Sequence, residues 1–473
     1  MHRSLTLSAV LLAALGGVSS AAPRERVSTL ADQRAVGVTV YNGDLAVVRD
    51  RRHVALDAGE TRLALRDVSG RMQPETAVLQ SLDASAPFTV DEQDFDYDLL
   101  TPQKLLEKYV GRDVVVLHPA DKSGHRARER ARVLAANNGV VLRYADRIET
   151  TVDGDLAYPS IPANLRDRPT LVTDVEDARG GARDVELDYL TGGLTWRADY
   201  TAMLDAADDR MDLRGLVTLT NQSGATYRDA SVQLVAGNVH VPVRQPAPLQ
   251  QIGRVTTADV FSAPRQEGLL EYHLYTLPRK TTIEDAQTKQ VELLRARAFP
   301  VTETLELRGG GDYYWNDANA GDLGTRTNPA TYLTFRNAGG DLGIPLPAGI
   351  VRVYKRDSAG TAQFVGGDAI PHTPDGDTVR LFLGTAFDVV AYKQRTDFHT
   401  IDARTHQSSY RIAIHNAKPA PQTVLVVETI PYEWTISETS APFEKTSSTT
   451  ATWRITVPAR GDAVLTYTAR VRS

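Results

Sequence analysis

The sequence of 473 residues contains no cysteine. A chain without thiols can have no disulfide framework, no thiolate nucleophile and no cysteine that carries a lipid anchor. The stability of the folded protein must therefore come from the burial of side chains.

The chain also lacks the short motifs of several common enzyme classes. It has no Gly-x-Ser-x-Gly nucleophile elbow, no His-Glu-x-x-His metal helix and no Gly-Lys-Ser/Thr phosphate loop. Each absence removes one usual route to catalysis. The sequence therefore nominates no catalytic residue, no metal site and no cofactor.

Charge of one sign is not concentrated anywhere in the chain. The 53 Lys and Arg residues and the 59 Asp and Glu residues are intermixed, and the formal net charge is −6. The densest basic run, 125–132, is interrupted by Glu129. Nucleic-acid binding needs a basic stripe that neutralises phosphates, so we expect no nucleic-acid partner.

Long hydrophobic runs are absent except at the start. A positive beginning, an apolar run over 5–18 and small residues up to Ala21 are typical of a secretory signal peptide, here residues 1–21. No later stretch reaches the ~20 apolar residues of a membrane span. We expect a periplasmic or secreted protein without a transmembrane segment, soluble after the signal peptide is cleaved.

Alternating apolar and polar residues dominate the remainder of the chain. Such a period of two marks strands with one buried face, and it recurs in 193–204, in 451–457 and in 463–471. Residues 57–60 interrupt one run like a hairpin turn, and we interpret 284–298 as a strand. The short strands between Gly, Pro, Asn and Ser predict a mainly β protein with several immunoglobulin-like or fibronectin-like sandwiches.

One segment has helical spacing instead. Thr101 and Pro102 are typical of a helix start, and Leu105, Leu106 and Tyr109 follow at helical intervals. This short helix and the strands after it predict a small inserted barrel of Sm-like form. The domains expected after the signal peptide are an N-terminal β domain over 22–98, the insert over 99–168, a central sandwich region over 169–394 and a C-terminal sandwich over 395–473.

Several segments, in the same order along the chain, resemble the bacterial family called domain of unknown function 4139. They include Val40–Arg49, Tyr97–Leu100, Leu105–Gly111, Gly193–Tyr200, Leu234–Gly237, Tyr272–Pro278 and Gly384–Val389. The resemblance implies an exported or envelope protein rich in β-sandwiches, with distant relatives described as mucoidy-inhibitor-like. It implies no catalytic residues.

Three clusters of polar or aromatic residues are candidate sites. The acidic run 91–98 could bind calcium, but a solvated strand edge is the simpler interpretation. His399, His406 and His415 have no spacing typical of a zinc site, so we interpret them as surface residues. The strongest candidate for ligand binding is an aromatic loop segment that could stack on sugar rings or fill the end of a sandwich, formed by Tyr313, Tyr314, Trp315, Asn316 and Asp317.

Two functions of different classes remain open. The first is a non-catalytic or structural envelope module that binds another envelope protein or a surface polysaccharide. The alternative is a carbohydrate-active or other hydrolase with paired carboxylates between domains. The lack of catalytic motifs and the concatenated sandwiches favour the first.

Overall fold

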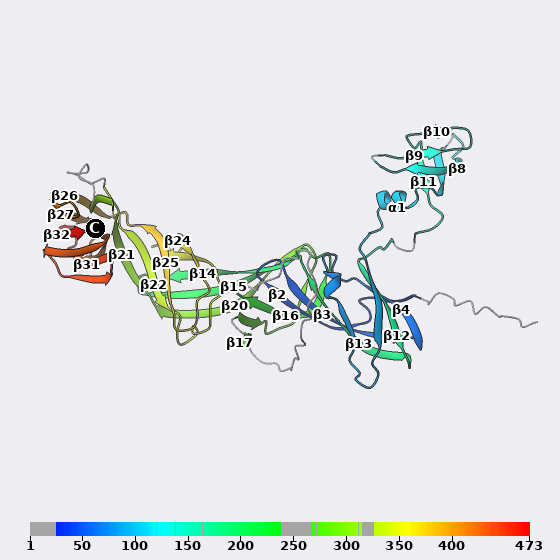
Figure 1. The fold of residues 1–473 in the computed structure, drawn as a ribbon, viewed down its shortest axis with the longest axis horizontal. Coiled ribbons are helices and arrows are strands. Elements are labelled where there is room, and N and C mark those ends of the chain that lie inside the picture. The colour runs from blue at the N-terminus through cyan, green and yellow to red at the C-terminus, as the bar shows by residue number, and fades with distance from the viewer. Residues whose placement is uncertain are drawn as a thin grey trace, which may run out of the picture.

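The computed structural model describes residues 25–120, 122–137, 139–162, 165–237, 266–269, 272–310, 312–314 and 326–473. The predicted signal peptide lies outside these ranges. The described chain is mainly β and forms several separate sheets along the long axis of the molecule (Figure 1), as the alternating patterns predict. Within the described ranges, no helix is long and apolar enough to cross a membrane.

Two sheets build the N-terminal half. The N-terminal sheet has the order β1-β4-β12-β6, from Glu25–Ser28, Gly59–Arg66, Thr170–Asp177 and Thr89–Asp96. The first central sheet has the order β17-β18-β16-β2-β3-β13-β5, with β19 also beside β16. Its strands are β2 (Gln33–Tyr41), β3 (Ala46–Leu56), β5 (Val78–Ser81), β13 (Gly181–Thr191), β16 (Tyr227–Ala236), β17 (Gln266–Leu269), β18 (Tyr272–Thr276) and β19 (Thr281–Ile283). A short 3-10 turn, η1 (Pro74–Thr76), precedes β5.

The predicted hairpin at 57–60 is wrong, because β3 and β4 belong to different sheets. β3 pairs with β13 and β4 pairs with β12, so a two-stranded ribbon passes from one sheet into the other. Gly180 lies at this crossing with φ +66, and a Cβ atom there would lie 2.7 Å from the Ala58 nitrogen. The close approach of two backbones requires glycine at this position.

The inserted domain begins with helix α1 (Pro102–Lys108), as predicted. The Thr101 side chain caps it by accepting a hydrogen bond from the Lys104 amide at 3.1 Å. The inserted sheet has the order β10-β9-β8-β7-β11, from Ile148–Glu149, Val141–Arg143, Arg126–Ala135, Asp113–Ala120 and Asp155–Ala157. In the part of the chain that is described, this sheet is not a closed barrel, because its short end strands β10 and β11 do not pair with each other.

Three further sheets complete the chain. The second central sheet has the order β20-β15-β14-β23-β24, from Gln287–Pro300, Arg210–Asn221, Leu194–Leu204, Gly349–Arg356 and Ala362–Ile370. The shared sheet has the order β25-β22-β21-β28-β31-β30, from Thr378–Thr385, Ala330–Arg336, Thr302–Gly309, Gln422–Thr429, Thr450–Val457 and Phe443–Ser447. The C-terminal sheet has the order β26-β27-β32-β29, from Val389–Asp402, Thr405–Asn416, Gly461–Arg472 and Glu433–Thr439. Strand β20 confirms the strand interpretation of 284–298.

The shared sheet contributes side chains to two hydrophobic cores. Leu333 on β22 and Leu381 on β25 belong to the large core that also contains the N-terminal and central sheets. Val426 on β28 and Trp453 on β31 belong to the core beneath the C-terminal sheet. Strand β21 pairs with β22 on one side and with β28 on the other. The central and C-terminal sandwiches are therefore joined by continuous backbone hydrogen bonding.

Candidate functional site

The aromatic loop segment predicted from the sequence begins inside the C-terminal core. Tyr313 and Tyr314 lie on the 3-10 turn η2 (Asp312–Tyr314), where Tyr313 is partly buried and Tyr314 is 0% exposed. Trp315, Asn316 and Asp317 lie outside the described residues. Both described tyrosines therefore pack in the core of the C-terminal sandwich.

Tyr313 and Tyr314 surround a buried ion pair between the two sheets of this sandwich. Lys393 on β26 lies 2.6 Å from a carboxylate oxygen of Glu428 on β28, and the Glu428 side chain is 1% exposed. Both tyrosine hydroxyls donate to the same Glu428 oxygen, Tyr314 at 3.1 Å. We call Lys393, Glu428, Tyr313, Tyr314, Tyr410 and Tyr467 the tyrosine cluster.

The aromatic rings of this cluster also stabilise the Lys393 ammonium. Its nitrogen lies 3.8 Å from the ring centre of Tyr313 and 4.9 Å from that of Tyr410, within the range of cation–π attraction. The Tyr410 hydroxyl and the Arg395 guanidinium each donate to the Tyr313 carbonyl, at 3.2 and 3.1 Å. These contacts hold the backbone of η2 against the C-terminal sheet.

Burial controls the protonation of the tyrosine cluster. It lowers the pKa of Lys393 to about 8, although the Glu428 charge opposes this shift. Burial and the same negative charge raise the pKa of Tyr313 and Tyr314 well above that of a free tyrosine. The phenols therefore stay neutral at physiological pH and can donate to Glu428, so the cluster anchors the start of the loop.

Two of the exposed aromatic side chains lie near a junction between two sheets. Strand β24 at the edge of the second central sheet meets β25 at the edge of the shared sheet, where a Cβ atom at Gly366 would lie 2.5 Å from the Leu383 carbonyl oxygen. The Phe382 amide donates to Asp368 across the same junction at 2.8 Å. Glycine is required at this close approach because Gly366 also has φ +147.

Two phenylalanines point outwards near this junction. Phe364 is 60% exposed and Phe382 is 41% exposed. Each packs against a tyrosine of the neighbouring strand, Phe364 on Tyr354 at 5.6 Å and Phe382 on Tyr332 at 5.5 Å between ring centres. The Arg380 guanidinium lies 3.4 Å from the Tyr332 ring centre and pairs with buried Glu306. We call Phe364, Phe382, Tyr332, Tyr354 and Arg380 the aromatic corner.

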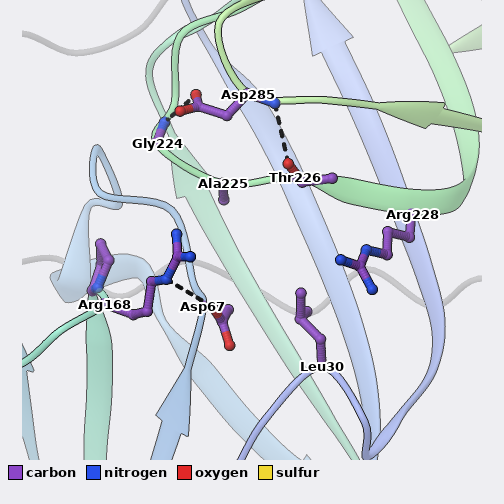
Figure 2. A pocket seen from close by; sticks show the side chains of 9 residues that line it. Leu30, Asp67, Arg168, Gly224, Ala225, Thr226, Arg228 and Asp285 are labelled. Atoms are coloured by element: carbon purple, nitrogen blue, oxygen red, sulfur yellow. Dashed lines mark hydrogen bonds and ion pairs between the residues drawn. The ribbon is translucent and has the colours of Figure 1, made fainter.

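A cleft lies between the N-terminal sheet and the two central sheets (Figure 2). Its volume is about 180 Å³. Leu30, Pro169 and Ala225 supply apolar walls, and the charged lining residues are Asp67, Arg168, Arg228 and Asp285. These residues come from turns and strand ends that are far apart in the sequence, so no motif could have identified the cleft.

The contacts inside the cleft leave one cation without a carboxylate. Asp285 accepts from the Gly224 amide at 2.9 Å, while its own amide donates to the Thr226 hydroxyl at 3.2 Å. Arg168 is 3.8 Å from Asp67. Among the described ion pairs, none includes Arg228. The cleft therefore offers guanidinium groups to a ligand, while Asp285 already stabilises the turns around it.

The acidic run lies largely on the edge strand β6, where two of its carboxylates are paired with arginines. Asp94 lies 3.1 Å from Arg62, and Asp96 lies 2.9 Å from Arg166. Asp98 lies just beyond β6, and its hydrogen bond to Lys108, on α1, lowers its pKa. These carboxylates stabilise the sheet and the position of α1.

The three predicted surface histidines do not converge. His399 pairs with Asp397 at 2.8 Å and His415 pairs with Asp462 at 2.8 Å, whereas His406 lies beside Thr400. Over the described ranges, no group of three or more His, Asp or Glu side chains is arranged to hold a metal ion.

Comparison with known proteins gives a family but no activity. The family described as domain of unknown function (DUF4139) matches residues 185–473, which is more than half of the chain. This match contains the tyrosine cluster and the aromatic corner. No curated protein matches the sequence.

Proposed function

We propose that this chain, which belongs to the DUF4139 family, is an exported, non-catalytic protein that binds another protein of the cell envelope. The N-terminal segment with its apolar run supports export to the periplasm or beyond. The joined sandwiches support a binding role, because they hold exposed side chains on a rigid scaffold.

The aromatic corner is the observation that carries the proposal. Protein interfaces are enriched in aromatic residues and arginine, and a few such residues supply most of the binding free energy. Phe364 and Phe382 expose large apolar rings, and Arg380 lies over the Tyr332 ring that packs on Phe382. Isolated exposed apolar residues are ordinary, whereas two of them at one junction between sheets indicate a contact surface.

The corner is also preorganised for binding. Phe364 and Phe382 lie on strands, and tyrosine rings pack against both. Side chains that are already ordered lose less conformational entropy when a partner binds. The predicted ligand-binding residues Trp315, Asn316 and Asp317 follow the anchored η2 turn, and we propose them as a second contact.

A hydrolase remains the alternative, with a polysaccharide as its substrate. Such an enzyme needs an acid and a nucleophile or base on either side of the scissile bond. In the described cleft, Asp285 is occupied by a backbone amide and Asp67 lies beside Arg168. These contacts favour a structural role for both carboxylates, so we prefer binding.

Site-specific photocrosslinking in living cells tests the proposal. The photoreactive residue p-benzoylphenylalanine is placed at position 364 or 382, and at the exposed control position of Tyr97. We expect one envelope protein to be crosslinked from 364 and 382 but not from 97. The same protein must be absent when the signal peptide is deleted.

Purified components then test whether that contact is direct. Because truncation of an interface hot spot costs about 2 kcal/mol or more, the double variant Phe364→Ser/Phe382→Ser should bind the purified partner at least tenfold more weakly. Equal affinity of the wild type and the variant would reject the corner. Failure to crosslink any protein, with polysaccharide binding that the same variant abolishes, would make a glycan the ligand instead.

A further inference from the structure

The cleft of Figure 2 is a candidate small-ligand site separate from the aromatic corner. Arg168 and Arg228 enter it from opposite sides, with Asp67 and Leu30 below them in that view and Ala225 above. From this arrangement, we propose that the cleft binds the carboxylate of a small ligand or of a chain end through the guanidinium group of Arg228.

The unpaired cation is the first reason. Arg228 has no carboxylate partner among the described residues, and the 3.8 Å between Arg168 and Asp67 exceeds the ~2.7–2.9 Å of a charge-assisted hydrogen bond. A planar guanidinium matches a carboxylate through two parallel N–H donors. A ligand carboxylate at Arg228 would therefore accept hydrogen bonds that no carboxylate of the described residues accepts.

The acidic lining residues limit the charge of the ligand. Asp67 and Asp285 offset the formal charges of Arg168 and Arg228, so the cleft as a whole is close to neutral. A dianionic phosphate would meet two carboxylates at short range, and like charges so close are repelled. A monoanionic carboxylate gains the guanidinium contacts with less repulsion, so the charge balance favours it.

The remaining walls limit the size and polarity of the ligand. Leu30, Pro169 and Ala225 offer apolar contact next to the charged groups. The volume of about 180 Å³ is below the ~300–1,000 Å³ of pockets for drug-sized ligands. The cleft therefore fits a short branched aliphatic acid, or the last residue of a polypeptide with its terminal carboxylate.

Occupation of the cleft would connect separate parts of the molecule. Arg168 precedes β12 of the N-terminal sheet, Arg228 lies on β16 of the first central sheet, and Asp285 precedes β20 of the second central sheet. A ligand that contacts these elements together stabilises the folded arrangement by mass action. The inference does not depend on the proposed protein partner, because none of these residues belongs to the aromatic corner.

Saturation-transfer NMR with 4-methylpentanoate tests the inference, because this method detects weak ligands of large proteins. The neutral amide of the same acid tests whether the carboxylate is required. We expect saturation transfer to the acid and not to the amide. The variant Arg228→Ala should reduce the signal severalfold, while Arg454→Ala, which removes an exposed arginine on β31, should leave it unchanged.

Each result of these experiments either supports or overturns the proposal. An equal signal from the acid and the amide, or an unchanged signal in Arg228→Ala, would overturn the proposal. A thermal unfolding midpoint of Arg228→Ala equal to that of the wild type shows that a lost signal is not lost folding. A peptide that ends in leucine, with a free or an amidated C-terminus, identifies the source: stronger transfer to the free peptide than to the acid indicates a protein chain end.

Discussion

Lys393 and Glu428 face each other across the C-terminal sandwich, with 2.6 Å between the ammonium nitrogen and a carboxylate oxygen. Because four tyrosines surround the pair, removing one charge leaves the other buried and unpaired. We therefore expect Lys393→Met to destabilise the C-terminal sandwich by about 3–5 kcal/mol, measured by denaturant unfolding followed through the fluorescence of Trp434 and Trp453.

Two further variants test whether the unpaired buried charge causes that loss of stability. The double variant Lys393→Met/Glu428→Gln should be more stable than the single one, because it leaves no unpaired buried charge. Lys355→Met removes one partner of a more exposed pair, in which Lys355 and Asp208 are 31% and 36% exposed, and should cost at most about 1 kcal/mol. Equal losses in both lysine variants would contradict the importance of burial.

Gly309 lies beside this pair and leaves no room for a side chain without a shift of its neighbours. A Cβ atom at Gly309 would overlap the Glu428 carboxylate and the Tyr313 hydroxyl, whereas one at Gly310 would meet its nearest atom at an ordinary 3.8 Å. Gly309→Ala should cost about 1–3 kcal/mol through overpacking, with Gly310→Ala as its matched control. Thermal unfolding of the two variants side by side is the measurement, and equal midpoints would disprove the clash.

The buried tyrosines predict a loss of stability in alkali. Burial raises the pKa of Tyr227 from 10.0 to about 12, and it raises the pKa of Tyr189 well above the free value. Between these pKa values the folded protein keeps protons that the unfolded chain releases. The contribution of these tyrosines to the stability of the folded protein is therefore complete below the pKa of an unfolded tyrosine. It is lost as the pH rises through the folded pKa.

Spectrophotometric titration of tyrosinate checks this prediction. Exposed tyrosines such as Tyr97, which is 69% exposed, should ionise first, and the buried ones only as the protein unfolds. The denaturant midpoint should be lower at about pH 11 than at about pH 9. A single ionisation phase of all tyrosines in the folded protein would refute the prediction.

Gly366 should control the aromatic corner. A Cβ atom there would press on the Leu383 carbonyl and move β24 away from β25. Gly366→Ala should therefore weaken partner binding and cost about 1–3 kcal/mol, while Gly43→Ala, with no atom within 4 Å of its added Cβ, should change neither. Binding to the crosslinked partner and thermal unfolding measure the two effects. Unchanged binding in Gly366→Ala would show that the junction does not control the contact surface.

Local patterns of the sequence predict local structure well here. Thr101 and Pro102 locate the start of α1, and the alternation from Leu194 to Leu204 matches the buried face of β14. Alternation also contains the signal for the buried ion pair, since Glu428 is in phase with buried Val424 and Val426. A charged residue at such a position needs a partner, but the sequence does not identify Lys393 as that partner.

The sequence does not show which distant strands pair with each other or which sheets pack together. The residues at 57–60 predict a hairpin because strand length and turn residues are local signals. The placement of β3 and β4 in different sheets depends instead on their distant partners β13 and β12. The cleft could not be predicted for the same reason, since Leu30 and Asp285 meet only after the sheets assemble. The inserted sheet has the predicted helix and strands, but β10 and β11 are too short to close it.

The sheet shared by two cores has a mechanical consequence. Sandwiches on flexible linkers bend independently, and a pull on one is lost in the linker. Here tension that enters through β31 passes to β28, β21 and β22, which are paired side by side by backbone hydrogen bonds. A load applied to β31 in the C-terminal sandwich therefore reaches β22 through hydrogen-bonded strands and not through a flexible linker.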